Sequence, residues 1–218
     1  MPKAILTISS KNYSSWSLRG WLLCRMSGLE FDERSASVDE ASNRAELLLL
    51  SPSFVVPSLE HEGARIWDTL SIAEYLNEIK PESQLYPADR KIRAYCRSIS
   101  GEMHGGFYNL RSALPMNLRA RYPGFKVWAG AQPDIARIVE IWSGGLQAYG
   151  GPYLCGPRLS VADAIFAPVV TRFQTYDVPL TGPCAAYRDT LLAWPALAEW
   201  TRDALAEPIE VEELDVEF

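Results

Sequence analysis

A proline stands inside the first arm of a predicted β-hairpin, and this feature constrains the fold of the N-terminal part most. The two arms are residues 54–60 (Phe-Val-Val-Pro-Ser-Leu-Glu) and 64–67 (Ala-Arg-Ile-Trp), with Gly63 at the turn. Because proline has no N–H to give to a neighbouring strand, Pro57 belongs at the start or the edge of its strand. A cis peptide bond between Val56 and Pro57 is one way to make this tight entry.

Strand-like and helix-like patterns alternate through the N-terminal part of the chain. A β-like run covers residues 4–8, a helical repeat of apolar residues covers 18–29, and a weaker strand candidate lies at 31–36. A second helix ends near Leu50, and a third opens after the hairpin at Asp68. The order β-α-β-α-β-β-α, with a proline before the hairpin, predicts a thioredoxin-like domain.

The remainder of the chain shows helical patterns only. Apolar residues repeat at helical spacing over 92–103 and over 135–146, and the pair Gly105-Gly106 should interrupt the first of these helices. Ser160 and Asp163 have the spacing of a capping box at the start of another helix. We therefore expect a thioredoxin-like domain over 1–80, a linker over 81–90, an all-helical domain over 91–206 and an acidic tail over 207–218.

Composition and charge narrow the possible partners. The 218 residues carry a net charge of −6, but the last twelve hold six acids and no base, so the remainder is neutral. No basic patch favours nucleic acid, no apolar run approaches the roughly 18 residues of a membrane span, and no signal-peptide core is visible. We expect a cytoplasmic protein without a nucleic-acid or membrane partner. Four scattered cysteines and two histidines predict buried thiols and no metal.

Three serines, Ser14, Ser15 and Ser17, stand where the first strand ends and the first helix begins. The start of a helix presents unpaired N–H groups and the positive end of the helix dipole, so an anion is stabilised there. A serine hydroxyl at that place can also donate a hydrogen bond to a thiolate. Helix capping explains one of the serines equally well, because serine is a preferred N-cap residue.

Five short motifs in a fixed order resemble those of the glutathione S-transferases, and together they span nearly the whole chain. Residues 14–19 (Ser-Ser-Trp-Ser-Leu-Arg) are similar to the S-S-C-S-W-R of serine-type members such as the zeta class, and Val56-Pro57 stands where the family has its cis-proline. The other three motifs resemble the family's E/Q-S-x-A-I-x-x-Y-L, its domain linker and its capping box: 68–76 (Asp-Thr-Leu-Ser-Ile-Ala-Glu-Tyr-Leu), 85–87 (Leu-Tyr-Pro) and 159–163 (Leu-Ser-Val-Ala-Asp). Two further stretches, at 102–107 and 114–117, are similar to a bacterial subgroup.

The resemblance implies a cytosolic glutathione transferase fold and an enzyme that activates the thiol of glutathione, its co-substrate. A free thiol has a pKa of about 8.5, so a hydroxyl donor must lower that pKa before the thiolate is abundant at pH 7. Ser14 is the implied donor, with Ser15 or Tyr13 as alternatives. Ser14 and Ser17 match the two redox cysteines of thioredoxins, which disfavours a thiol–disulfide oxidoreductase.

The resemblance also assigns the rest of the glutathione site. Val56, ahead of Pro57, would pair its backbone with the cysteinyl part of glutathione as an added strand. Asp68 would take the ammonium of the γ-glutamyl end and Thr69 its carboxylate. Two departures stand out, because Asp68 is one methylene shorter than the usual Glu or Gln, and the lysine that often holds the glycine carboxylate is missing. Arg44 is a possible substitute for that lysine.

The second substrate would lie between the two domains. The candidates for an apolar electrophile pocket are Trp16, Met103, Phe107 and Tyr108, although helical spacing makes Met103, Phe107 and Tyr108 equally typical of a hydrophobic core.

Two groups of polar residues near this predicted pocket have alternative interpretations. His104 is either an acid or base in the pocket or a helix histidine with satisfied hydrogen bonds, and we favour the second. Three arginines either attract an anionic substrate or form a solvated basic face, and we favour the basic face: Arg111, Arg119 and Arg121.

The leading functional interpretation is glutathione transfer to a small apolar electrophile, as in detoxification. The alternatives are a glutathione-dependent isomerase of the zeta type and a non-catalytic glutathione- or ligand-binding protein on the same fold. The resemblance implies a homodimer. The acidic tail is either a disordered end or a segment that folds back over the body.

Overall fold

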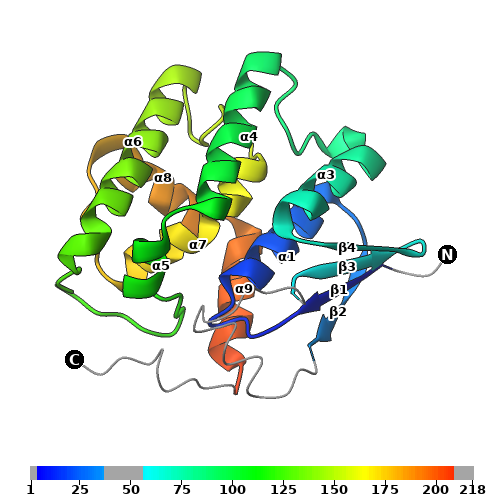
Figure 1. Ribbon diagram of the computed structural model, residues 1–218, viewed down its shortest axis with the longest axis horizontal. Coiled ribbons are helices and arrows are strands. Elements are labelled where there is room, and N and C mark those ends of the chain that lie inside the picture. Colours follow the sequence, from blue (N-terminus) through cyan, green and yellow to red (C-terminus); the bar gives the residue numbers. More distant parts are fainter. Residues whose placement is uncertain (1–3, 37–55, 209–218) are drawn as a thin grey trace.

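The computed structural model describes residues 4–36 and 56–208. Within them, a four-stranded sheet and two helices form one part of the molecule, and the helices from α4 onward form the other (Figure 1). This is the predicted combination of a thioredoxin-like domain and a helical domain. The predicted helix ending near Leu50, and Arg44 with it, lie outside the described residues.

The sheet has the strand order β2-β1-β3-β4. Its strands are β1 (Ala4–Ile8), β2 (Phe31–Ser35), β3 (Ser58–His61) and β4 (Ala64–Trp67). β2 runs parallel to β1, whereas β3 is antiparallel to both β1 and β4. The hairpin, the weak strand at Phe31 and the cis bond between Val56 and Pro57 are thereby confirmed. Pro57 directly precedes β3, so its missing N–H interrupts no ladder hydrogen bond.

Two helices belong to the sheet part, α1 (Ser15–Ser27) and α3 (Thr69–Ile79), and they pack against each other. Gly20 makes a close contact possible here, because a Cβ at that position would lie 2.5 Å from Cβ of Pro57. The helix α1 therefore sits directly on the loop that carries the cis-proline.

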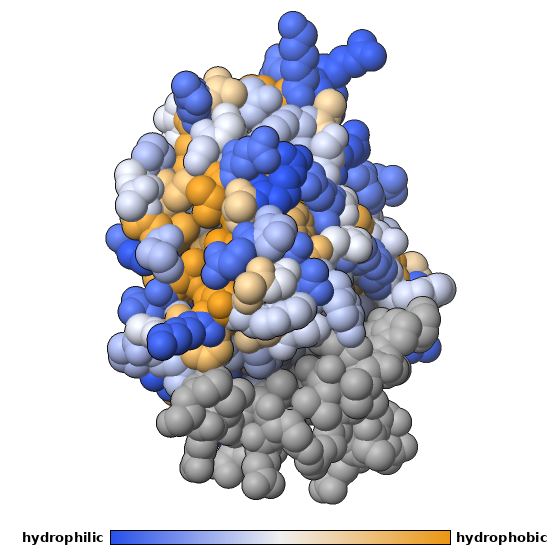
Figure 2. All heavy atoms as spheres, turned by 60° about the vertical axis from the view of Figure 1, so that its left-hand side comes forward, coloured by the Kyte–Doolittle hydropathy of each residue, from blue (hydrophilic) through white to orange (hydrophobic). Residues whose placement is uncertain are grey.

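The helical part contains six α-helices within the described residues. They are α4 (Arg90–Gly105), α5 (Tyr108–Ala113), α6 (Gln132–Tyr149), α7 (Val161–Thr175), α8 (Gly182–Leu192) and α9 (Pro195–Ala206). Short 3₁₀ turns lie at Pro81–Ser83 and Ala129–Ala131. The sequence analysis missed α8, whose buried residues are few and which starts at a Gly-Pro pair. Viewed from the side of α5 and α6, hydrophobic residues reach the surface in a band crossed by hydrophilic ones (Figure 2).

Helix α7 is the centre of the molecule. All its residues except Gln174 are buried, as expected for a helix packed on all sides, and it contacts α1, α4 and α8. The predicted capping box is confirmed, since the amide and hydroxyl of Ser160 both donate to Asp163 Oδ2, at 2.8 and 2.9 Å. The amide of Leu154 and the hydroxyl of Tyr187 donate to the other oxygen, Oδ1. Asp163 is thus a structural residue.

The glycine pair ends α4 as predicted. Gly106 follows the helix, and a Cβ there would lie 2.7 Å from the carbonyl oxygen of Glu102. Phe107 then takes a left-handed conformation (φ 61°) before α5 begins. Arg111 of α5 reaches back and donates to the last carbonyls of α4, those of Met103 and His104. A cation at the C-terminal end of a helix is stabilised by the helix dipole.

The four cysteines are buried and free, as predicted. No helix within residues 4–36 and 56–208 has the length and apolar character needed to cross a membrane. The same residues contain no group of His, Cys, Asp and Glu side chains placed to hold a metal ion.

Candidate functional site

The loop between β1 and α1 delivers Ser14 to the start of α1. The backbone of Ser14 is extended (φ −83°, ψ 97°), and its hydroxyl oxygen accepts a hydrogen bond from the amide of Ser17 at 3.3 Å. The same hydroxyl donates to Ser17 Oγ at 2.9 Å. Ser14 is therefore the N-cap of α1, and a thiolate bound here would compete with Ser17 for its proton.

Ser15 is the first residue of α1 and is also buried. Within the described part of the chain, its hydroxyl makes no hydrogen bond. Tyr13, the third candidate donor, is 3% exposed. Two serine hydroxyls thus lie at the positive end of α1. The Ser14 hydroxyl is hydrogen-bonded to Ser17, and the Ser15 hydroxyl has no hydrogen-bond partner within the described residues.

Trp16, in the first turn of α1, is surrounded by cationic and aromatic groups. The guanidinium groups of Arg19 and Arg111 lie over its ring, 4.8 and 4.9 Å from the centroid, within the range of a cation–π interaction. The His104 ring meets it edge-on at 5.0 Å. Because Arg111 and His104 belong to the helical part, Trp16 marks where the two parts of the molecule meet.

The start of α3 carries the two residues assigned to the glutamyl end of glutathione. Asp68 caps the helix, and its Oδ1 accepts from the amides of Leu70 and Ser71 at 2.8 and 3.3 Å. Its backbone has a positive φ of 73°, an unfavourable value for a residue with a Cβ. Such outliers concentrate at functional sites. Thr69 follows it and is fully buried.

His104 joins the helical part to both of these residues. Its Nε2 lies 2.9 Å from Asp68 Oδ2, and its Nδ1 lies 3.3 Å from Thr69 Oγ1. Partial burial alone would raise the pKa of Asp68. The hydrogen bond and charge of His104, with the amides of Leu70 and Ser71, outweigh that effect and lower the pKa. The expectation that His104 has satisfied hydrogen bonds is confirmed, although its partners come from another part of the molecule.

Arg19 and Arg172, which were not predicted from the sequence, are buried close to the site, and Arg111 is partly buried beside them. Burial lowers the pKa of each guanidinium, to about 10 for Arg111 and to about 9 for Arg172, and neighbouring guanidiniums add to the effect at Arg19 and Arg172. Their hydrogen bonds go to backbone carbonyls, such as Ile165 O for Arg19 and Leu114 O for Arg172. The solvated basic face that we favoured is therefore wrong for Arg111.

The other candidates for the electrophile pocket lie in different environments. Met103 is fully buried and Phe107 is 8% exposed, and both belong to the hydrophobic core. Tyr108 is 68% exposed. Trp16 contacts Arg19, Arg111 and His104, and the carbonyl of Met103 accepts from Arg111. The composition of the pocket stays a prediction.

Glu207, the residue that follows α9, binds the loop between β1 and α1. The Glu207 carboxylate accepts hydrogen bonds from Ser10 Oγ and from the amides of Lys11 and Asn12, at 2.7, 2.9 and 3.0 Å. Asn12 in turn accepts from the amide of Leu118. This loop, which leads into Ser14, is thereby held from two other segments of the chain.

These elements converge on one place. The start of α1, the cis-proline loop, the start of α3 and the end of α4 meet through Gly20, Trp16 and His104. Two helix N-termini with serine and threonine hydroxyls form a site suited to the carboxylate and thiolate of a small peptide. The fold and the site define a thioredoxin-like protein with an added helical domain.

Comparison with known proteins gives the family. Models of the glutathione S-transferase N-terminal domain and C-terminal domain match residues 13–79 and 126–203. The chain belongs to the glutathione S-transferase family. It is 27% identical over 182 residues to a maleylacetoacetate isomerase of Rattus norvegicus, covering 82% of each chain. It is 25% identical over 167 residues to a glutathione S-transferase of Dianthus caryophyllus, covering 76% of each.

Solved structures share the fold. A glutathione transferase homologue from Burkholderia, with bound glutathione, has a TM-score of 0.69 and 22% identity over 94% of this chain and 100% of that one. A theta-class glutathione S-transferase from Xanthomonas axonopodis pv. citri, also with glutathione bound, has a TM-score of 0.65 and 21% identity over 94% of this chain and 100% of that one.

Proposed function

We propose that this protein binds glutathione at the junction of α1 and α3 and uses the Ser14 hydroxyl to stabilise its thiolate for attack on a small apolar electrophile. The observation that carries the proposal is the convergence of the two helix N-termini beside the cis-proline. A hydroxyl donor and the α1 dipole both favour the anion, and each unit by which the thiol pKa falls corresponds to about 1.4 kcal/mol.

We infer the glutathione contacts from the family resemblance, and the position of Asp68 and Thr69 at the start of α3 supports them. The backbone of Val56, before cis-Pro57, would pair with the cysteinyl unit. Asp68 and Thr69, at the start of α3, would bind the γ-glutamyl ammonium and carboxylate. Ser15 is the second candidate for the thiolate donor, because its hydroxyl is not engaged elsewhere among the described residues.

The test is a pH titration of bound glutathione by ultraviolet thiolate absorbance in the wild type, Ser14→Ala and Ser15→Ala. We expect a bound-thiol pKa clearly below that of free glutathione, which returns toward the free value in Ser14→Ala only. A lowered pKa that survives Ser14→Ala and is lost in Ser15→Ala would move the role to Ser15. Binding without any shift of the pKa would contradict thiolate activation and favour a carrier.

A glutathione-dependent isomerase is the second candidate, and the names of the curated relatives favour it. Both reactions need the same activated thiolate. They differ in the fate of glutathione, because a transferase consumes it and an isomerase regenerates it. Counting free thiols before and after turnover of a candidate substrate separates the two.

We also infer a homodimer in the cytoplasm, as in the family. The face formed by α3 and β4 is hollowed and lined by Ile66, Leu70, Ser71, Glu74, Tyr75 and Glu78, and Trp67 of β4 is 55% exposed. A face that mixes apolar and charged side chains suits a subunit contact. Sedimentation should give twice the mass of one chain. Leu70→Glu should shift the measured mass toward that of a single chain.

A further inference from the structure

The feature that carries a further inference is the pair of hydrogen bonds made by one imidazole. His104 lies at the end of α4, yet Nε2 binds Asp68 and Nδ1 binds Thr69, at 2.9 and 3.3 Å. The side chain is 27% exposed, so it is held by these contacts and still reachable by solvent. Within the described residues, both ring nitrogens are directed at the start of α3.

Asp68 depends on this contact for its orientation. One carboxylate oxygen is used by the helix cap, where it accepts from Leu70 and Ser71, and the other faces His104. Aspartate is shorter than the glutamate or glutamine usual at this position, so its carboxylate cannot reach as far from the backbone. The imidazole fixes the outer oxygen in one place, where an ammonium group can approach it.

The proton on the imidazole also sets the role of the Thr69 hydroxyl. The carboxylate of Asp68 only accepts, so Nε2 carries a proton. When the ring is neutral, Nδ1 accepts from the Thr69 hydroxyl, which then has no proton to give to a ligand. When the ring is protonated, Nδ1 donates to the same oxygen, and the Thr69 hydroxyl is free to donate to a carboxylate.

We propose that His104 is a positioning residue for the glutamyl end of glutathione, which orients the Asp68 carboxylate and sets the direction of the Thr69 hydroxyl bond. The proposal rests on the proposed function, because it needs glutathione in this site. Glutathione affinity is thereby linked to a group of the helical part.

The charges around His104 come from several elements. The Asp68 carboxylate faces it from α3, and Arg111 of α5 donates to its carbonyl. Arg19 of α1 lies beyond Trp16. Glu102, on the same helix, is paired with Arg137 of α6. The Asp68 carboxylate is therefore the anion in direct contact with the imidazole among the described residues.

The experiment measures equilibrium binding of S-methylglutathione by calorimetry at one fixed pH. This probe keeps the glutamyl end but has no ionisable thiol, so thiolate activation does not enter. The variants are His104→Ala, His104→Gln, whose amide nitrogen reaches the place of Nε2, and Thr69→Val, which removes the hydroxyl and keeps the shape.

We expect His104→Ala to weaken binding about 10-fold, the size expected for one lost hydrogen bond to a charged group. His104→Gln should recover most of the affinity through its hydrogen bond to Asp68. Thr69→Val should also weaken binding, because it removes the hydroxyl that faces Nδ1. In turnover assays His104→Ala should raise the KM for glutathione with little change in kcat.

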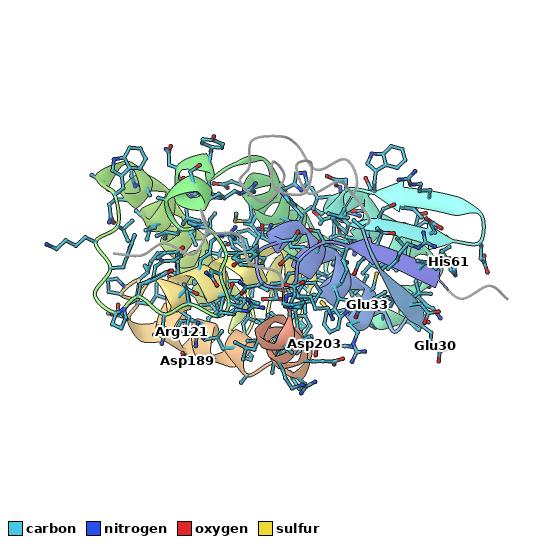
Figure 3. The ribbon with its side chains drawn as sticks, turned by 90° about the horizontal axis from the view of Figure 1, so that it is seen from below. Glu30, Glu33, His61, Arg121, Asp189 and Asp203 are labelled. Atoms are coloured by element: carbon cyan, nitrogen blue, oxygen red, sulfur yellow. The ribbon has the colours of Figure 1, made fainter. Side chains whose placement is uncertain are left out.

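The matched control is the other histidine. His61 of β3 hydrogen-bonds Tyr75 at 2.9 Å and lies at the end of the sheet that is remote from the helical part (Figure 3). His61→Ala should keep the affinity of the wild type.

Three outcomes would overturn the proposal. Equal affinity of His104→Ala and the wild type for the probe would remove His104 from glutathione binding while leaving the proposed function intact. A loss of kcat with unchanged binding would place His104 at the thiolate or the electrophile instead. A wild type that does not bind the probe would overturn the proposed function as well.

Discussion

Asp68 combines two side-chain contacts with an unusual backbone conformation. It caps α3, it pairs with His104, and its backbone has a positive φ that costs free energy. A residue kept in an unfavourable conformation is expected where the surrounding contacts determine it. In this chain those contacts come from the amides that follow it and from the imidazole of another part of the molecule.

The lowered pKa of Asp68 predicts a pH-dependent contribution to stability. Because the pKa is lower in the folded state than the roughly 3.9 of an unfolded chain, the ionised carboxylate stabilises the fold above about pH 4. The contribution is lost as the pH falls through the lower, folded-state pKa. Asp68→Asn keeps an acceptor for the helix cap but removes the charge. It should be less stable than the wild type in urea at pH 7, and the difference should vanish near pH 2.

Asp68→Ala tests the cap separately. It removes the acceptor for Leu70 and Ser71 as well as the charge, so we expect a further loss of about 1 kcal/mol that persists at low pH. If Asp68→Asn were equally destabilised at pH 7 and pH 2, the pair with His104 would not be the origin of its effect.

At the scale of elements, α1 is built to lie directly on the cis-proline loop. Gly20 faces Pro57, whose ring atoms would lie 2.5 and 2.7 Å from an added Cβ. A proline ring cannot rotate away, so Gly20→Ala must push α1 and the loop apart. Overpacking of this kind costs about 1–3 kcal/mol. We expect that loss in denaturant unfolding, together with weaker binding of glutathione.

Gly101 provides the matched control. It lies inside α4, and an added Cβ would meet nothing within 4 Å. Gly101→Ala should therefore stabilise the protein by about 0.5–1 kcal/mol through helix propensity. A similar gain in Gly20→Ala would show that α1 and the proline loop are not in contact in solution.

Glu207, directly after α9, provides a second structural contact to the loop that precedes the site. Glu207 accepts three hydrogen bonds from Ser10, Lys11 and Asn12, in the loop that leads to Ser14. Glu207→Ala leaves these donors without their carboxylate, and we expect a loss of about 2 kcal/mol and a higher thiol pKa of bound glutathione.

The control for Glu207→Ala is an exposed ion pair between α9 and α1. Glu199 of α9 binds Arg25 at 2.6 Å, and both side chains are substantially exposed. Glu199→Ala should change the free energy of unfolding by less than about 1 kcal/mol, because exposed ion pairs contribute little. Equal effects of the two substitutions on both stability and thiol pKa would contradict a specific role for Glu207.

Local signals in the sequence were enough to predict most elements and part of the site. The proline before the hairpin, the helix start at Asp68 and the Ser160–Asp163 box each depend on neighbours within a few residues, and all three are confirmed. The contacts of His104 and Arg111 were not predictable in this way. They depend on how α4 and α5 pack against the sheet part, which periodicity does not determine.

For the molecule as a whole, the core is continuous between the two parts. One cluster of buried hydrophobic residues includes Leu22 of α1, Ile72 of α3, Phe166 of α7 and Trp200 of α9. Lys11 adds a polar link, since its Nζ binds Glu33 of β2 and Asp203 of α9, both at 2.8 Å (Figure 3).

This continuity predicts a single unfolding transition rather than one for each part. Trp21 and Trp200 pack with their ring centroids 5.4 Å apart and are both fully buried, so their fluorescence reports on the contact between α1 and α9. At one fixed protein concentration, fluorescence and far-ultraviolet circular dichroism should give the same midpoint in urea. Trp200→Ala should lower the free energy of unfolding by about 3–5 kcal/mol. Leu205→Ala, on the same helix but 59% exposed, should change it by less than about 0.5 kcal/mol. Separate midpoints for the two probes in the wild type would show that the parts unfold independently, and the site between them would then open without global unfolding.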